Sequence, residues 1–364
     1  MLGGEFKAAY PTQETSHRDV ATNKTLMRIL ITGITGFIGQ HVFSSLRDRD
    51  YELLALLHKH SLLPGKQESS ATASQLSRKA EIPWRNQSIY FPIRQENKIR
   101  TLKGDLNDLA AIKNDLKIFD PEVVIHLAWE GIPDFSFRMS QINLLNSIRL
   151  VDFLLDETHC RKIVIAGSCF ECGSIQGKCS EAQYFTLNSF FVWAKQSLYH
   201  YALLRCDEAK VDLVWPRLFY VYGPGQKRKS LIPILVDAFT DGRIPEIQNP
   251  WNANDFVDVE DVARAFLLAV EKTIDSGVYN LGSGRSTEVI KICEIVERQI
   301  TGKTQMTQQL KNQRRDVKQS VNFWADTSKT ENALGWQVQV PVEEGIRRYI
   351  NWAQSVMLNR GAEC

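Results

Sequence analysis

The fold is decided by residues 28–39, which read RILITGITGFIG, with glycine at positions 33, 36 and 39. The β-rich run 28–32 leads directly into the glycines, and residues 37–46 then carry apolar side chains at helical spacing. In such a strand–turn–helix unit the first glycine permits a tight turn, the second lets the backbone approach a pyrophosphate, and the third lets the helix pack closely on the strand. The helix N-terminus adds N–H donors and the positive end of its dipole. The unit therefore predicts a dinucleotide site that contains Gly33, Thr35, Gly36, Phe37, Ile38 and Gly39.

Strands and helices continue to alternate after this unit. Apolar runs predict buried strands at 51–57, 123–127, 162–166 and 211–215, and helical spacing predicts helices at 140–156 and 189–207. This alternation is typical of an α/β fold, a Rossmann-like doubly wound parallel sheet with helices on both faces and right-handed crossovers. Further along, helices are expected at 231–240, 262–271 and 287–300, and a strand at 277–281. Ligands should bind at the carboxyl ends of the strands, where the strand order reverses.

The 364 residues divide unequally around this sheet. Residues 1–26 are polar and are predicted to be a disordered extension or a tag remnant. Residues 27–215 are predicted to form a dinucleotide-binding domain with an insertion at 61–103, and segments near 255–284 return to this domain. The stretches 216–254 and 285–364 are predicted to form a smaller C-terminal substrate lobe.

The composition is that of a globular protein, with 43% hydrophobic and 24% charged residues, and 44 basic against 42 acidic residues. This charge balance gives no reason to expect nucleic acid or a membrane surface as a partner. No apolar run approaches the ~18 to 20 residues of a membrane span. The odd number of cysteines, 7, predicts free thiols in a reducing cytoplasm. Cys169, Cys172 and Cys179 are close in sequence but lack the second pair of ligands that a structural zinc site requires, so no metal is expected.

The end of the second strand bears on the choice of cofactor. A carboxylate that binds the adenosine ribose usually follows the glycine turn by about 20 residues. Here the strand ends at His58 and Lys59, whose cationic groups suit a 2′-phosphate and favour NADP(H). NAD(H) is the alternative, because ring stacking and backbone contacts can replace either charge. Asp105 is placed to accept a hydrogen bond from the adenine amino group, unless it is only a surface-loop aspartate.

Ordered sequence blocks extend this signal along the chain: the glycine turn, 104–106, 124–129, 166–173, 194–195, 216–226, 255–262 and 280–284. On these blocks the chain resembles the extended short-chain dehydrogenase/reductase family, which comprises NAD(P)-dependent nucleotide-sugar epimerases, dehydratases and 4-ketoreductases, over about residues 27–352. The resemblance implies a nucleotide-diphosphate sugar as substrate. It also implies a homodimer formed through the helices at 140–156 and 189–207.

The same resemblance implies roles for individual residues. Ser168 would hydrogen-bond the sugar hydroxyl or carbonyl that changes oxidation state. Lys195 would bind the nicotinamide ribose and lower the pKa of a catalytic tyrosine four residues earlier. Arg315 would clamp the nucleotide diphosphate, unless it lies in a solvated basic turn. The remaining implied contacts are Leu106, Leu127, Ala128, Trp129 and Pro216 to the cofactor, and Cys169, Tyr220, Gln226 and Leu231 to the substrate.

Phe191 stands where this family has its catalytic tyrosine, four residues before Lys195. It has no proton to give, and three interpretations remain open. It is a substitution made to trap a complex, or another donor acts, or the protein binds its ligands without turnover. The other donors to consider are Tyr184, Tyr220, Tyr222, Cys172 and an ordered water.

Three further departures narrow the chemistry. Cys172 replaces the usual tyrosine before a glycine, and Asn254 replaces a common arginine. Cys169 and Phe170 stand where the family's dehydratases carry an Asp-Glu pair, so 4,6-dehydration is disfavoured. The expected activity is reduction of the C4 ketone of a nucleotide 4-keto-6-deoxy sugar, in deoxysugar or surface-glycan biosynthesis. An epimerase and a catalytically silent nucleotide-sugar binder are the alternatives.

Overall fold

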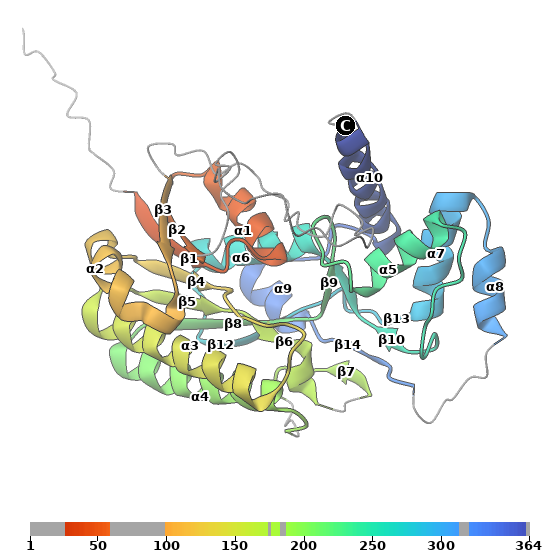
Figure 1. Ribbon diagram of the computed structural model, residues 1–364. Coiled ribbons are helices and arrows are strands. Elements are labelled where there is room, and N and C mark those ends of the chain that lie inside the picture. The colour runs from red at the N-terminus through yellow and green to blue at the C-terminus, as the bar shows by residue number, and fades with distance from the viewer. Residues whose placement is uncertain (1–25, 59–98, 174–175, 183–186, 313–319, 362–364) are drawn as a thin grey trace, which may run out of the picture.

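Figure 1 shows the computed structural model of the chain, which describes residues 26–58, 99–173, 176–182, 187–312 and 320–361. Most of the expected extension 1–26 and most of the insertion 61–103 lie outside these residues, as do Lys59, Tyr184 and Arg315. Residues 99–103, which the sequence assigns to the insertion, belong to strand β3 (Ile99–Gly104).

A parallel sheet forms the centre of the molecule, with strand order β12-β8-β5-β4-β1-β2-β3. Besides β3, its strands are β1 (Met27–Thr32), β2 (Tyr51–His58), β4 (Val123–His126), β5 (Lys162–Ile165), β8 (Asp212–Leu218) and β12 (Gly277–Leu281), and the short β6 (Gly167–Ser168) pairs with β8. Every pairing along this order is parallel. The order reverses at β1, which lies between β2 and β4. The predicted doubly wound sheet is confirmed.

Helices cover both faces of the sheet, because its strands are apolar on both sides (Figure 1). Along β1, Ile29 and Ile31 pack in one core cluster and Leu30 in the other, since successive side chains point to opposite faces. The first cluster is closed by α1 (Phe37–Arg47), α6 (Val259–Glu271) and α9 (Ser328–Leu334). The second is closed by α2 (Leu109–Phe119), α3 (Phe137–Glu157) and α4 (Phe190–Ala209).

A smaller lobe lies beside the carboxyl ends of the strands (Figure 1). It contains α5 (Leu231–Thr240), α7 (Val289–Thr301), α8 (Gln305–Lys311) and α10 (Val342–Gly361), with the short pairs β9 (Tyr220–Tyr222)/β11 (Phe256–Asp258) and β10 (Ala253–Asn254)/β13 (Thr287–Glu288). Part of the stretch 285–364, which the sequence gives to the lobe, packs on the sheet instead: Leu334 and Trp336 are buried in the cluster that contains β1. Asp255 joins the segments, since its buried carboxylate accepts hydrogen bonds from the backbone N–H groups of Gly284 (3.0 Å) and Ala325 (3.0 Å).

The cysteines differ from expectation at one place. Cys172 and Cys179 form a disulfide, next to the pairing of β7 (Gly177–Cys179) with β14 (Phe323–Ala325). The prediction that all thiols are free is therefore wrong for these two, because the fold brings their Cα atoms to 6.6 Å, within reach of a disulfide. The other cysteines of the described residues, Cys160, Cys169, Cys206 and Cys293, are free and buried.

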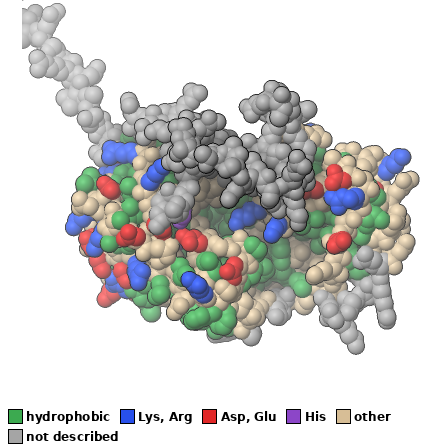
Figure 2. All heavy atoms as spheres, viewed as in Figure 1, with side chains coloured by type: hydrophobic (Ala, Val, Ile, Leu, Met, Phe, Trp, Pro, Cys, Tyr) green, Lys and Arg blue, Asp and Glu red, His purple; other side chains and the backbone are tan. Residues whose placement is uncertain are grey.

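The described surface agrees with the balanced charge of the sequence. Basic and acidic side chains are interspersed over the face drawn in Figure 2. None of the helices in the part of the chain that the structure describes is sufficiently long and apolar to cross a membrane.

Candidate active site

The glycine turn has the geometry that its sequence predicts. Gly33 has φ +72°, and a Cβ added there would lie 2.5 Å from the backbone nitrogen of Ala128, in the loop after β4. A Cβ on Gly39 would lie 2.2 Å from the carbonyl oxygen of Gly33. Gly36 precedes α1 and donates its N–H to the Gly33 carbonyl (3.0 Å). The turn therefore excludes side chains at the first and third glycines, which brings β1, α1 and the β4 loop together.

A cavity of about 220 Å³ opens where β1 to β4 end. It is lined by Thr32, Gly33, Thr35, Gly36, Leu56, His58, Gly104, Leu106, Leu127, Ala128, Trp129 and Glu130. The cavity thus brings together eight of the residues expected at the cofactor: Gly33, Thr35, Gly36, His58, Leu106, Leu127, Ala128 and Trp129.

Other residues expected at the cofactor lie in the structure around this cavity. Phe37, Ile38 and Gly39 form the first turn of α1. Pro216 is buried within β8, where it pairs with Tyr279. The Asp105 carboxylate accepts hydrogen bonds from both the backbone and the side-chain nitrogen of Asn107 (2.9 Å each). Asp105 therefore caps the short helix η2 (Leu106–Asp108) as well as lying beside the cavity.

A buried hydrogen-bond chain fixes the floor of the cavity. The Ala128 backbone N–H donates to the hydroxyl of Thr32 (3.3 Å), which lies 2.7 Å from Nδ1 of His126. His126 Nε2 lies 2.9 Å from the hydroxyl of Ser147, which donates to the Asn143 carbonyl (2.7 Å). Burial lowers the pKa of His126 to about 3, so its ring is neutral at physiological pH. The sequence alone does not show that His126 is a structural partner, although this residue ends a buried strand.

Ser168 and Lys195 come from neighbouring elements beyond β5. Ser168 caps η3 (Cys169–Cys172): its hydroxyl accepts the Phe170 N–H (3.3 Å), and its own N–H donates to the Glu171 carboxylate (2.7 Å). Lys195, in α4, donates to the Ala166 carbonyl (2.8 Å) and lies 3.7 Å from the centre of the Trp129 ring. Burial lowers the pKa of Lys195 to about 7, and the Glu171 charge opposes this shift. The lysine ammonium therefore exchanges its proton near neutral pH.

Phe191 is buried in an aromatic cluster one helical turn before Lys195. Its ring centre lies 4.8 Å from that of Phe135, 5.6 Å from that of Trp129 and 6.2 Å from that of Phe170. Only 4% of the residue is exposed. The position thus keeps the shape of an aromatic residue beside Lys195, in apolar surroundings and without a hydroxyl.

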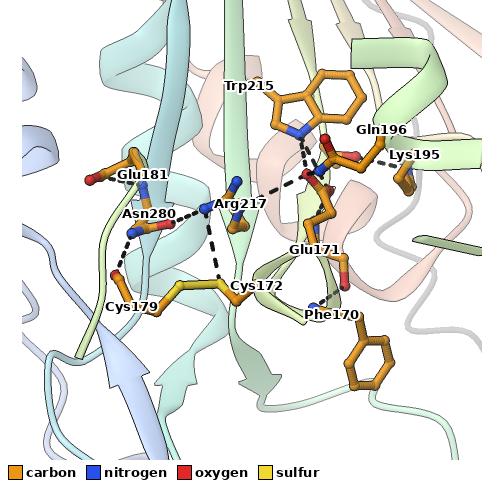
Figure 3. Close-up of polar contacts among 12 residues, drawn as sticks. Phe170, Glu171, Cys172, Cys179, Glu181, Lys195, Gln196, Trp215, Arg217 and Asn280 are labelled. Carbon is orange, nitrogen blue, oxygen red and sulfur yellow. Dashed lines mark hydrogen bonds and ion pairs between the residues drawn. A yellow bond between two sulfur atoms is a disulfide. The ribbon is translucent and has the colours of Figure 1, made fainter. Parts of the chain in front are cut away.

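Glu171 organises the polar side of this block, as Figure 3 shows. Its fully buried carboxylate accepts hydrogen bonds from the Gln196 amide (2.9 Å) and the Trp215 indole (3.0 Å), and it lies 3.8 Å from Nε of Arg217. Burial raises the pKa of Glu171, and the Arg217 guanidinium offsets part of that shift. Glu171 therefore holds η3, α4 and β8 in register behind Ser168.

Arg217 connects the same block to the disulfide (Figure 3). One guanidinium nitrogen donates to Oδ1 of Asn280 (3.5 Å) and lies 3.9 Å from the sulfur of Cys172. The Asn280 amide in turn donates to the Cys179 carbonyl (2.9 Å). The sequence alone does not single out Glu171 or Arg217, although both lie inside the quoted blocks.

The alternative proton donors among the described residues differ in position and in how readily each could release a proton. Cys172 has no thiol proton, because its sulfur is in the disulfide, so its candidacy is wrong. Tyr222 is buried in the lobe and donates to the Val342 carbonyl (3.4 Å). Tyr220 lies edge-on to Phe170, with ring centres 6.4 Å apart, and burial raises the pKa of its phenol. Burial also raises the pKa of the Cys169 thiol, to about 12. Lys195 is thus the group of this block whose proton is most easily exchanged at neutral pH.

The remaining residues expected at the substrate lie in and next to the lobe. The Gln226 amide donates to the Val221 carbonyl (3.1 Å), which fixes the loop after β9. Leu231 begins α5. Arg315 lies outside the described residues.

The model of the NAD dependent epimerase/dehydratase family matches residues 29–282 of the chain. Three individual proteins show what the chain is similar to. UDP-glucuronate 4-epimerase of Thermodesulfobacterium geofontis is 24% identical over 332 residues, covering 89% of this chain and 95% of that protein. dTDP-glucose 4,6-dehydratase of Haemophilus influenzae is 24% identical over 358 residues, covering 90% and 98%. A solved Tyr-to-Phe mutant of UDP-glucuronic acid 4-epimerase from Bacillus cereus, in complex with UDP-4-deoxy-4-fluoro-glucuronic acid and NAD, is 20% identical with a TM-score of 0.70, covering 91% of this chain and all of that one. Further matched structures are complexes with NAD.

Proposed function

Because the chain belongs to the NAD dependent epimerase/dehydratase family, within the extended short-chain dehydrogenases/reductases, we propose that it reduces the C4 ketone of a nucleotide-linked 4-keto-6-deoxy sugar. The observation that carries the proposal is the pairing of two features at the carboxyl ends of the strands. One is the cavity built on the glycine turn, and the other is the block that holds Ser168 and Lys195.

The glycine turn and the cavity fit a nicotinamide dinucleotide. The excluded Cβ positions at Gly33 and Gly39 leave backbone at the start of α1, where N–H groups and the helix dipole favour a pyrophosphate. When bound, a reduced nicotinamide supplies the hydride for the carbonyl carbon. The matched structures hold NAD, whereas His58 and Lys59 in the sequence favour NADP(H).

Two groups of this chain serve the ketone oxygen. The Ser168 hydroxyl donates a hydrogen bond to it, and the Glu171 carboxylate keeps Ser168 in place through the Ser168 N–H. Lys195 holds the proton that the oxygen finally takes, because its ammonium is buried beside the site and Phe191 supplies none. Lys195 is therefore both a binding residue and the acid of the proposed reaction.

Dehydration of the sugar has less support than reduction. In the family, dehydratases are expected to carry an Asp-Glu pair as acid and base at the two positions after the serine that Ser168 resembles. Cys169 is buried with a pKa raised to about 12, and Phe170 has no ionisable group. A 4-epimerase is the alternative enzyme, and the names of two matched proteins favour it.

A binding protein without turnover is the second candidate, and Phe191 favours it. The phenylalanine is enclosed by three aromatic rings at the position of the family's acid. The matched Tyr-to-Phe mutant from Bacillus cereus still holds NAD and a nucleotide-sugar analogue. A Tyr-to-Phe change in that protein thus leaves both ligands bound.

Two assembly and location predictions accompany the proposal. A homodimer through α3 and α4 is supported by exposed apolar side chains on these helices: Phe137, Leu145, Phe190 and Leu204. Cytoplasmic location stays a prediction. The disulfide argues against it, because disulfides are rare in a reducing compartment.

The experiment combines binding and turnover. The protein is incubated with NADH or NADPH and a panel of nucleotide 4-keto-6-deoxy sugars, and the absorbance of the reduced cofactor is followed. Loss of that absorbance with one of the sugars supports the reductase. Tight binding of cofactor and sugar by calorimetry without any oxidation would establish the silent binder instead.

A further inference from the structure

The ribose end of the dinucleotide cavity carries a carboxylate that the sequence does not place there. In this fold an acidic residue at the end of the second strand usually binds the adenosine ribose. Here β2 ends at His58 and the next residue in the sequence is Lys59, so the end of this strand carries no carboxylate. The Glu130 carboxylate, from the loop after β4, lies 3.8 Å from Nε2 of His58. Asp105, after β3, approaches the same nitrogen at 3.8 Å.

Glu130 is held in this position from two sides. Its backbone N–H donates to the Asn143 side chain (2.7 Å), and its carbonyl accepts from the same amide (3.1 Å). Its carboxylate accepts a hydrogen bond from the Asn107 side chain (3.4 Å), and Asn107 is itself bound by Asn146 (2.9 Å). The Glu130 side chain is nevertheless 43% exposed and lines the cavity, so it can reach a ligand.

We propose that Glu130 supplies, from the β4 loop, the ribose-binding carboxylate that this fold normally takes from the end of β2, and that it makes the site select NAD(H) over NADP(H). A carboxylate accepts hydrogen bonds from the ribose hydroxyls of NAD(H). A 2′-phosphate at the same place brings like charges together, which opposes NADP(H) binding.

The surroundings of His58 strengthen this reasoning. Nε2 of His58 lies 3.8 Å from two carboxylates, those of Glu130 and Asp105, so a phosphate beside this ring would meet two negative charges. The preference for NADP(H) that His58 suggests in the sequence is thereby opposed by carboxylates in the segments that follow β3 and β4. The inference rests on the proposed dinucleotide site and adds the residue that chooses between its two cofactors.

The test measures the dissociation constants of NADH and NADPH by calorimetry for the wild type, Glu130→Gln and Glu130→Asp. Glu208→Gln is the matched control, because Glu208 is 73% exposed on α4 and pairs with Arg205. Titrations contain a chelator, since the ligand atoms of His58, Asp105 and Glu130 lie within 4.8 Å of one another and would also suit a divalent cation. Thermal unfolding of each variant confirms that it is folded.

The wild type should bind NADH at least about tenfold more tightly than NADPH, and Glu130→Gln should reduce that ratio about tenfold or more. Glu130→Asp, which keeps the charge, should retain most of the preference, and the control should match the wild type. A wild type that prefers NADPH, or a ratio unchanged in a folded Glu130→Gln, would overturn the inference. A wild type that binds neither cofactor would instead overturn the proposed function, so the two failures are distinct.

Discussion

Replacing Lys195 with methionine is expected to slow the chemistry by about 10² to 10⁴-fold while stabilising the fold. Burial lowers the pKa of Lys195 from an ordinary value of 10.5 to about 7, so the folded protein holds the ammonium at a cost. At about 1.4 kcal/mol per pKa unit, the shift corresponds to up to ~5 kcal/mol at pH 7. Methionine leaves the Ala166 carbonyl without its donor, which costs ~1 to 3 kcal/mol, so we expect a net gain of about 2 kcal/mol in the free energy of unfolding.

The pH dependence of stability has a definite sign. The folded-state pKa lies near 7 and the unfolded-state pKa near 10.5, so the unfolded state binds more protons between these values. The free energy of unfolding contributed by this group therefore rises with pH across that window. The stability advantage of Lys195→Met over the wild type should shrink as pH rises from about 7 toward 10.5, measured by denaturant unfolding at several pH values.

The kinetic effect is in the opposite direction. Loss of a general acid costs about 10² to 10⁴-fold in rate, so the kcat of Lys195→Met at saturating cofactor and sugar should be lower than that of the wild type by this factor. In the wild type, kcat should decrease about tenfold per pH unit above about 7, because the neutral amine has no acidic proton to give. The assay is initial-rate oxidation of the reduced cofactor, with both dissociation constants measured separately to isolate the chemical step.

Lys162→Met provides the control. Lys162 is also a buried lysine with a pKa lowered by burial, but it lies at the start of β5 and donates to the Ala269 carbonyl (3.0 Å). Its variant should leave the pH profile of kcat unchanged. If Lys195→Met instead keeps its rate within about tenfold and shows the same pH limb, Lys195 does not hold the transferred proton. If it is less stable than the wild type, the assigned burial cost is wrong.

Three other variants test separate parts of the site. Phe191→Tyr should raise the rate about 10²-fold or more, since it adds a second proton donor one helical turn before Lys195, whereas the same change at the neighbouring Phe170 should not. Equal rates for both variants would contradict a tyrosine-type site. Glu171→Ala should lower the free energy of unfolding by about 3 to 5 kcal/mol, measured by urea unfolding, because it leaves Arg217 buried without its carboxylate. Glu171→Gln should lower it by clearly less, and equal losses for the two variants would refute the ion pair. Cys179→Ser should lose about 2 kcal/mol, and a thiol reductant should bring the wild type to the same value; a wild type insensitive to reductant would mean that the disulfide does not form.

The sequence predicts those parts of the site that depend on local spacing. The glycine turn before α1 predicts a strand–turn–helix unit, because a side chain at Gly33 or Gly39 would clash with nearby backbone. The structure contains this unit. The distance of one helical turn between Phe191 and Lys195 likewise survives, since both lie on the same face of α4. The placement of the sheet and its covering helices follows from the same short-range patterns.

Contacts between distant segments could not be predicted in this way. Glu130 and His58 meet only because β2 and β4 flank β1, and a linear search for a carboxylate after β2 misses the one from another strand. The sequence predicts free thiols at Cys172 and Cys179 because the cysteine count bears only on the redox compartment. It does not indicate which cysteines approach one another in the fold. The role of Glu171 depends on Gln196 in α4 and on Trp215 and Arg217 in β8, two elements that are distant from η3 in the sequence.

The central claim, reduction of a C4 ketone at the site that holds Ser168 and Lys195, is tested most directly by following the hydride itself. The protein is mixed with a nucleotide 4-keto-6-deoxy sugar and a reduced nicotinamide cofactor that carries deuterium at its C4 position, and the sugar product is analysed by mass spectrometry and NMR. We predict one deuterium at C4 of the sugar in the wild type and about 10²-fold slower labelling in Lys195→Met. Tight binding of both ligands with no deuterium in the sugar would contradict the account.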